Sequence, residues 1–204
     1  MSGGVAAPFR LPTLYLLRHG ETEDNVARVI SGQSDSPLTP RGRAQARANG
    51  RLLSELLPDF SVVDFFASTL GRTQTTMQLV RESAGLTPTG YRIDPRLMES
   101  DFGAWTKGSI ASAFAARDAA LAATGETEHS WRWPDGESRA DVEARVQQFL
   151  QELRRDAVIV AHAGSITVIR GLALGMASDK MWARGLGDVG IIRIQDSTEA
   201  RFGA

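Results

Sequence analysis

The stretch LLRHGETEDN, residues 16–25, places Arg18, His19 and Gly20 directly after an apolar run. Consecutive apolar residues are typical of a strand that is buried on both faces, so the run predicts a strand over Thr13 to Leu17. The chain has only three histidines. One of them therefore follows a predicted strand, between a permanent positive charge and a glycine that leaves room for backbone to approach an anion.

Three more apolar runs predict buried strands. They are Val62 to Ala67, Ala157 to Ala161 and Gly190 to Ile194. Helical patterns lie between the runs. The first begins with Thr39 as the N-cap and Pro40 in the first turn, and it repeats apolar residues at four-residue steps, at Ala44, Ala48, Leu52 and Leu56. The others extend from about Arg72 to Ala84, from about Ser138 to Arg154, and onward from Gly164.

Buried strands that alternate with helices predict an α/β fold, a three-layer α/β/α sandwich with a mostly parallel central sheet. Residues 1–204 are expected to form a single domain, because no repeat or long linker divides them. The segment from Trp105 to Pro134 breaks the alternation. We expect it to form a helical lid excursion, about residues 105–136, over one end of the sheet.

The excursion holds three of the four tryptophans, Trp105, Trp131 and Trp133. The simpler interpretation is that they pack the excursion onto the sheet. The alternative is that they shape a pocket for an apolar or aromatic part of a ligand.

The composition narrows the choice of partners. The 23 Lys+Arg and 24 Asp+Glu leave a net charge of −1, so no excess of positive charge favours nucleic acid or an anionic membrane as partner. The absence of cysteine excludes a disulfide framework and thiolate chemistry. The first twelve residues lack the apolar segment of a secretion signal, and no apolar run reaches membrane-spanning length. We expect a cytoplasmic protein.

Four polar side chains follow the predicted strands: Arg18 and His19 after the first, Arg72 after the second and His162 after the third. Ligands of open α/β sheets bind beyond the carboxyl ends of the strands, so these side chains are expected to meet. Arginines donate paired hydrogen bonds to phosphoryl oxygens, and a neutral imidazole can attack phosphorus. Nearby positive charge would lower the pKa of that histidine, and a backbone carbonyl would fix its reactive tautomer.

Six blocks of this sequence, in this order, resemble the histidine phosphatase superfamily, also called phosphoglycerate mutase-like. They are LRHGETEDN, GQSDSPLTPRGRAQA, STLGRTQTT, LMESDFGAW, PDGES and VIVAHAGSI. The resemblance covers roughly residues 13–175. It implies that His19 is the nucleophile that becomes phosphohistidine, and that Arg18, Arg72 and His162 hold the transferred phosphoryl group. It also implies that Glu99 protonates the leaving alkoxide and later activates water.

Further positions match residues that line the phosphate or substrate side in this family: Asn25, Gln33, Ala163 and Gly164. The amide of Gly164 or Ser165 could supply an additional oxyanion donor. Two departures leave the substrate open. Ala163 stands where the family usually has a glycine, and GAWTKGS lacks the acid that commonly precedes the glycine of this block.

The chemistry supports an acid near Glu99 independently, because release of an alkoxide at neutral pH needs a proton. Asp101 is the rival carboxylate, and it is expected on the solvent side. His129 is interpreted as a solvated loop residue, with contact to a substrate from the lid as the alternative. A metal site of His19, His129 and His162 is rejected, because the spacing is wrong and the arginines would repel a cation. No metal or other cofactor is expected.

The resemblance and the residues together predict a metal-independent phosphomonoester hydrolase that acts on a small phosphorylated metabolite. The first alternative is a cofactor-dependent phosphoglycerate mutase. The compact stretch from Asp101 to Ala161, with few basic residues near the lid, favours hydrolysis. The second alternative is a phospholigand-binding protein that has lost catalysis. A homodimer through a sheet edge or a helix face would be ordinary for this family.

Overall fold

The computed structural model describes residues 11–183, 186 and 190–203. Residues 1–10, for which the sequence predicts no secretion signal, lie outside the described residues. Within the described part, the strands form one sheet in the order β3-β2-β4-β1-β5-β6. They are β1 (Leu14–Arg18), β2 (Val63–Ala67), β3 (Arg92–Ile93), β4 (Asp156–Ala161), β5 (Ile191–Gln195) and β6 (Thr198–Phe202). The strands β3, β2, β4 and β1 are parallel, and β5 and β6 are antiparallel to their neighbours.

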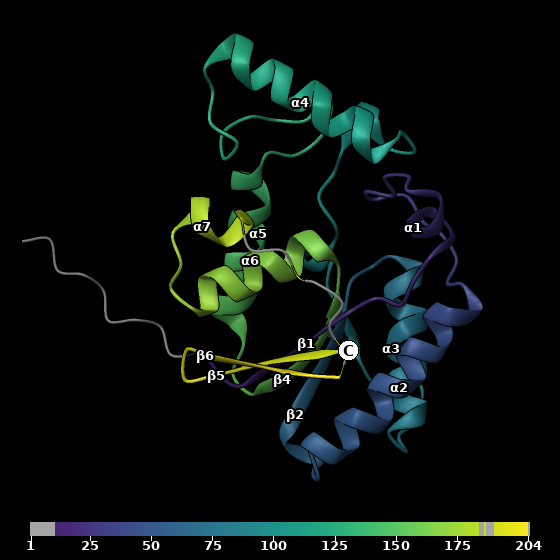
Figure 1. The fold of residues 1–204 in the computed structure, drawn as a ribbon. Helices are drawn as coiled ribbons and strands as arrows, with labels where there is room; N and C mark the ends of the chain where they lie inside the picture. The colour runs from purple at the N-terminus through teal and green to yellow at the C-terminus, as the bar shows by residue number, and fades with distance from the viewer. Residues whose placement is uncertain (1–10, 184–185, 187–189, 204) are drawn as a thin grey trace, which may run out of the picture.

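Helices cover both faces of this sheet. The α-helices are α1 (Glu23–Ala27), α2 (Pro40–Leu56), α3 (Gly71–Ser83), α4 (Ile110–Thr124), α5 (Arg139–Glu152), α6 (Ala163–Ala173) and α7 (Ser178–Ala183). Short 3-10 helices are η1 (Phe60–Val62), η2 (Pro95–Leu97) and η3 (Gly103–Trp105). Figure 1 shows α2 and α3 on one side of the sheet, α5 and α6 on the other, and α4 apart from the sheet at the top.

Side chains of the apolar run that precedes His19 pack into two hydrophobic cores, one on each face of the sheet. Leu14 and Leu16 belong to the apolar cluster that β1 and β4 share with α5 and α6. Tyr15 and Leu17 belong to the cluster on the other face, with α2 and α3. Successive side chains of a strand point to opposite faces, so a strand covered on both faces must be apolar at every position. The predicted three-layer α/β/α sandwich with a mostly parallel sheet is confirmed.

The helix predicted after Thr39 is confirmed, and its cap is the hydrogen bond from Gly42 N to Thr39 Oγ1 (3.0 Å). The apolar repeat marks the buried side only in its second half, because Leu52 and Leu56 pack against the core while Ala44 and Ala48 are exposed. The fully buried residues of α2 are Gly42, Ala46, Gly50 and Leu53. A Cβ on Gly42 would lie 2.1 Å from Glu21 O, and one on Gly50 would lie 2.3 Å from Val80 O. The helix therefore packs mainly through glycine and alanine, and the spacing of larger apolar residues does not fully predict which side of it is buried.

Several short elements are absent from the sequence-based prediction, namely α1, α7, β3 and β6. The hairpin between β5 and β6 shows why. Its turn residues Asp196 and Ser197 both have positive φ, 47° and 56°. Such a turn usually carries Asn-Gly or Asp-Gly. Here the sequence is Asp-Ser, so the glycine that would have indicated a hairpin is missing. In the described residues no helix is long and apolar enough to cross a membrane.

The excursion is helical, as expected, and contains α4 between the N-cap Ser109 and the C-cap Gly125. Its tryptophans line neither of the two cavities described below, and they pack with one another and their neighbours rather than on the sheet. They form a separate cluster of aromatic and apolar residues: Ile30, Phe102, Trp105, Ala113, Phe114, Trp131 and Trp133. The excursion therefore has a small core of its own beside the loop that follows α1.

Candidate active site

The carboxyl ends of β1, β2 and β4 bring the predicted polar residues together. His19 N donates to Ala161 O (3.0 Å), and Ser68 N donates to Val160 O (3.2 Å), which continues the strand register beyond the sheet. His162 follows β4 directly. The ring centroids of His19 and His162 are 5.2 Å apart, with the planes inclined at 59°. The predicted convergence of the two histidines is confirmed.

The ring of His19 is buried and fixed in orientation. Its Nδ1 lies 2.8 Å from Gly20 O, so the neutral ring carries its proton on Nδ1 and a lone pair on Nε2. Burial, together with the positive charges of Arg18 and Arg72, lowers the pKa of His19 from 6.5 to about 3. The carbonyl partner and the direction of the shift agree with the sequence analysis, but burial rather than charge is the largest cause.

Gly20 is required by packing. A Cβ at this position would lie 2.2 Å from Gly42 O, in the backbone of α2. Gly20 N also donates to Thr76 Oγ1 (3.1 Å) in α3. The absence of a side chain at Gly20 was expected to make room for an anion, but the backbone of α2 occupies this space. The loop that follows His19 is therefore fixed between α2 and α3.

His162 is fully buried, and its ring is oriented by Ser68. The Nε2 atom lies 2.9 Å from Ser68 Oγ, while Nδ1 has no hydrogen-bond partner among the described residues. Leu70 N donates to the same Ser68 oxygen (3.4 Å), which fixes the hydroxyl beside the ring. Burial, together with the positive charges of Arg72 and Arg145, lowers the pKa of His162 well below 6.5.

Arg72 lies at the start of α3 and is only 2% exposed. Its Nη1 donates to Ser34 O (2.6 Å) and its Nη2 donates to Gly32 O (2.8 Å). Its Nε is buried and has no partner in the part of the chain that the structure describes. Two carbonyls of the loop after α1 thus hold the two Nη atoms of the guanidinium, and the Nε–H donor stays unpaired among the described residues.

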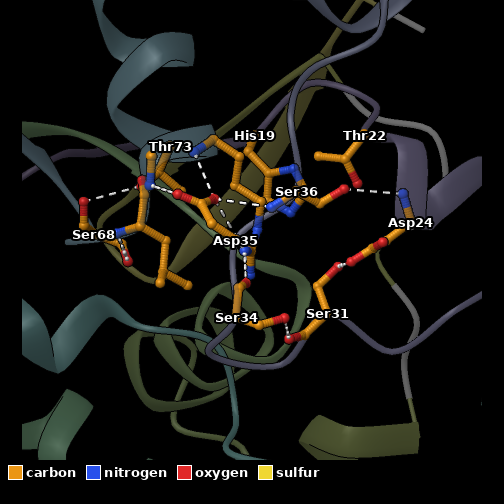
Figure 2. A network of polar contacts seen from close by, with 12 residues as sticks. His19, Thr22, Asp24, Ser31, Ser34, Asp35, Ser36, Ser68 and Thr73 are labelled. Atoms are coloured by element: carbon orange, nitrogen blue, oxygen red, sulfur yellow. Dashed lines mark hydrogen bonds and ion pairs between the residues drawn. The ribbon is translucent and has the colours of Figure 1, made fainter. Parts of the chain in front are cut away.

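Asp35, in the same loop, caps α3 from outside the helix. Its carboxylate accepts Gly71 N (2.7 Å) and Arg72 N (3.2 Å), whereas the N-cap residue Leu70 provides no side-chain cap. Figure 2 shows this carboxylate within a polar network that includes Ser34 and Ser36. Asp35 therefore fixes the end of the helix on which Arg72 lies.

Glu99 lies against the start of α6. Its Oε1 accepts Gly164 N (3.0 Å) and Ser100 N (2.9 Å). A Cβ on Gly164 would lie 2.3 Å from the same Oε1. The amide of Gly164 is therefore used to hold Glu99 and is not a free oxyanion donor. The rival, Asp101, is half-buried and accepts Gly103 N (2.8 Å), so it closes a loop instead.

Two further predicted residues support the loops around the site. Gln33 Nε2 donates to Glu99 O (3.2 Å), and Arg145 Nη2 donates to the same oxygen (3.1 Å). Asn25 closes the capping box of α1 with Thr22, whose N donates to Asn25 Oδ1 (3.1 Å). Gln33 thus fixes the backbone of Glu99, and Asn25 fixes the helix that follows His19.

Two cavities meet at Arg18, whose exposed side chain lines both. The first, about 420 Å³, is lined by His19 and Asn25 and continues along α2. The second, about 580 Å³, is lined by Glu99, Ala163 and Gly164. The remaining predicted residues line neither cavity: Arg72, His162 and Gln33.

His129 lies away from both cavities, and its side chain is 44% exposed. Its Nδ1 is 3.3 Å from Glu143 Oε1, which also accepts Trp182 Nε1 (2.8 Å). His129 is therefore a half-exposed partner of a carboxylate, and the interpretation as a freely solvated loop residue is corrected.

Sequence reasoning missed five residues that shape the site: Asp35, Ser68, Phe102, Phe114 and Trp182. Ser68 and Asp35 stand inside blocks that resemble the family, so their position in the motifs was the available signal. The three aromatic residues line the second cavity. They come from three separate segments, and no local pattern in the sequence joins them.

Comparisons with known proteins agree with this geometry. The family model described as histidine phosphatase superfamily (branch 1) matches residues 14–201. The chain is 35% identical over 162 residues to a probable phosphoglycerate mutase GpmB of Enterobacter sp. (strain 638), which covers 79% of this chain and 71% of the relative. Among solved structures, it is similar to the alpha-ribazole phosphatase from Shigella flexneri, with a TM-score of 0.70, 30% identity and coverage of 93% and 94%.

A mycobacterial glucosyl-3-phosphoglycerate phosphatase is also similar in structure, with a TM-score of 0.73, 31% identity and 90% coverage of both chains. The named relatives thus include both phosphatases and mutases. The fold, the paired histidines at the end of the parallel strands and the match over nearly the whole described chain lead to one conclusion. The chain belongs to the histidine phosphatase superfamily, branch 1, an enzyme of the phosphatase or mutase type.

Proposed function

We propose that this protein is a metal-independent phosphomonoester hydrolase that acts on a small phosphorylated metabolite through a phosphohistidine on His19. The observation that carries the proposal is the contact between His19 Nδ1 and Gly20 O (2.8 Å). It leaves Nε2 unprotonated, and burial keeps the ring neutral. A neutral imidazole with a free nitrogen beside cationic donors is the state that attacks phosphorus.

The donors around His19 suit the transferred phosphoryl group. Arg72 Nε and His162 Nδ1 are buried beside this ring without partners in the described part of the chain. Buried polar atoms are rarely left unpaired, so two such atoms support a missing anionic ligand. Arg18 adds an exposed cation that lines both cavities. These fixed donors would stabilise the transition state electrostatically.

In the first step, His19 Nε2 forms a bond to phosphorus while the bond from phosphorus to the ester oxygen breaks. Glu99 donates its proton to that oxygen, and the neutral alcohol leaves. In the second step, Glu99 takes a proton from water as the water oxygen attacks the phosphohistidine. The bond from nitrogen to phosphorus breaks, inorganic phosphate is released, and His19 returns to its neutral state.

The test is phosphate release from a panel of alkyl and sugar phosphate monoesters, with His19→Ala as the blank and with EDTA in a parallel series. We expect release by the wild type that EDTA does not reduce. We also expect an acid-labile mass increase of one phosphoryl group on His19 during turnover. Equal rates for the wild type and His19→Ala would overturn the assignment of the nucleophile.

The second candidate is a phosphoglycerate mutase, which is favoured by the 35% identity to a relative named as a probable phosphoglycerate mutase. In a mutase, the phosphohistidine returns its phosphoryl group to a bound intermediate. The two functions differ in their need for a bisphosphoglycerate. We expect phosphate release without it, whereas strict isomerisation of 3-phosphoglycerate with negligible release would select the mutase.

A further inference from the structure

The second cavity has one polar end and one aromatic wall. Glu99, the proposed acid, lines the polar end together with Arg18, which also lines the first cavity with His19. The wall is lined by Phe102, Phe114 and Trp182. A volume of about 580 Å³ is well above what a phosphoryl group and a three-carbon alcohol need. The cavity therefore has room for a bulkier leaving group directly beyond the proposed acid.

Phe102 and Phe114 are anchored by the core of the excursion. Both pack on Trp133, with ring centroids 4.9 Å and 5.7 Å away, and Trp133 is only 8% exposed. Phe102 and Phe114 remain partly exposed. Tilted and edge-to-face aromatic contacts of this kind fix ring orientation. These two rings are thus a preformed apolar surface.

Trp182, from α7, is held by polar partners. Its Nε1 donates to Glu143 Oε1 (2.8 Å), and the Arg139 guanidinium lies 5.0 Å from its ring centroid. Because the N–H group is already satisfied, the indole offers the cavity an apolar surface without an unpaired donor. Glu143 also accepts Ser178 Oγ (2.7 Å), so the first turn of α7 is held by the same carboxylate.

The charges near this wall leave little support for an anionic leaving group. Arg139, above Trp182, is paired with Glu128. Arg117, 4.7 Å from the ring centroid of Phe114, is paired with Asp118 (2.7 Å). Among the residues that line the cavity, the cation is Arg18, which the proposed function assigns to the phosphoryl group. A second anionic group would instead meet the carboxylate of Glu99.

We propose that the leaving alcohol of the physiological substrate carries an uncharged, planar aromatic ring system that binds between Phe102, Phe114 and Trp182. The inference rests on the proposed hydrolysis at His19 and specifies its substrate class. Ring stacking on these side chains would orient the ester oxygen toward Glu99, because both line the same cavity. A compact carboxylated alcohol would leave the aromatic wall uncovered.

The experiment compares phosphate esters of primary alcohols, so that leaving-group acidity stays similar: 2-naphthylmethyl, benzyl and ethyl phosphate, and 3-phosphoglycerate. We expect kcat/KM for 2-naphthylmethyl phosphate to exceed that for ethyl phosphate by about 100-fold, the order of discrimination of an apolar pocket. Trp182→Ala should reduce this ratio at least about tenfold, while Trp182→Phe retains most of it. The control is Trp131→Phe, in the same excursion but lining neither cavity, which should leave the ratio unchanged.

A ratio near one, or a preference for 3-phosphoglycerate, would overturn the inference while leaving the hydrolysis intact. No release from any ester would overturn the proposed function, and binding then decides the inference separately. Non-hydrolysable 2-naphthylmethyl phosphonate should bind more tightly than methyl phosphonate by calorimetry, with the advantage lost in Trp182→Ala. Equal affinities of the wild type for the two phosphonates would overturn the inference independently of turnover. Thermal unfolding of each variant confirms that it is folded.

Discussion

At the scale of single residues, the site depends on which ring nitrogen carries the proton. Gly20 O accepts from His19 Nδ1, and Ser68 binds His162 through Nε2. The two rings are thus held by opposite nitrogens. His19 presents a free lone pair on Nε2, and His162 leaves Nδ1 without a partner among the described residues. Two copies of the same side chain thus offer the site different ring nitrogens.

Histidine NMR tests this arrangement. We expect His19 and His162 to remain neutral from pH 8 to pH 5, because burial lowers the pKa of both, that of His19 to about 3. Nitrogen-15 shifts should report the Nδ1–H tautomer for His19, because Gly20 O can only accept a hydrogen bond. Spectra of variants that lack one histidine each assign the signals. Ser68→Ala is the matched control, since it should change the signals of His162 and leave those of His19. Protonation of His19 above pH 6 would contradict the structure.

Gly164 offers a second test at this scale, through the position of Glu99. In Gly164→Ala, the new Cβ would lie 2.3 Å from Glu99 Oε1 and displace the carboxylate. Loss of a general acid typically costs about 10²–10⁴ in rate. We expect Gly164→Ala and Glu99→Gln to lose more kcat/KM on alkyl phosphates than on p-nitrophenyl phosphate, whose leaving group needs no proton. The ratio kcat/KM reports the transfer to His19 and not the later activation of water. An equal loss on both substrates would argue against Glu99 as the acid.

At the scale of elements, glycines set how closely α2 approaches the site loop. Gly42 and Gly20 face each other across this contact. Gly42→Ala would favour the isolated helix by helix propensity, yet its Cβ would lie 2.1 Å from Glu21 O. We expect the clash to win and the variant to lose about 1–3 kcal/mol of unfolding free energy, as overpacked cores do. Chemical denaturation measures it, with Ala44→Ser on the exposed face of the helix as control. An unchanged midpoint for Gly42→Ala would refute the close contact.

The start of α3 depends on a carboxylate from another segment. Asp35→Ala removes the acceptor for Gly71 N and Arg72 N, and loss of such a cap costs about 1 kcal/mol. Because Arg72 lies on this turn, we also expect KM to rise more than kcat falls. Asp35→Asn keeps an acceptor oxygen and should recover most of the loss. A purely structural cap would lower stability without moving KM, and that outcome would separate the two roles.

At the scale of the whole molecule, buried neutral histidines make stability depend on pH. The folded pKa values of His19 and His162 lie below the unfolded value of 6.5, so the unfolded state binds more protons as the pH falls. Their contribution is complete above pH 6.5 and is lost as the pH falls below that value, for His19 down to its folded pKa of about 3. Each group contributes a slope of up to about 1.4 kcal/mol per pH unit.

We therefore expect the unfolding free energy of the wild type to fall more steeply between pH 6 and pH 4.5 than that of His19→Gln. Urea denaturation at several pH values measures both slopes, and carboxylates contribute equally to the two proteins. Parallel slopes would mean that His19 is not buried in its neutral form.

The sequence by itself determined the parallel strands β1, β2 and β4, the long helices between them and the identity of the polar residues at the strand ends. Each of these follows from local sequence patterns. A strand covered on both faces must be apolar throughout, and an N-cap residue such as Thr39 indicates where a helix begins. The order of the motifs was sufficient to bring His19 and His162 to one edge.

Only the tertiary structure decided what lies between segments that are distant in sequence. The buried face of α2 is set by close backbone contacts at Gly42 and Gly50, and no periodicity records them. The partners of His162 and Arg72, and the aromatic wall with Trp182, join side chains from separate elements. Such contacts depend on how neighbouring elements pack, so the sequence predicts the reaction while the packing selects the substrate we propose.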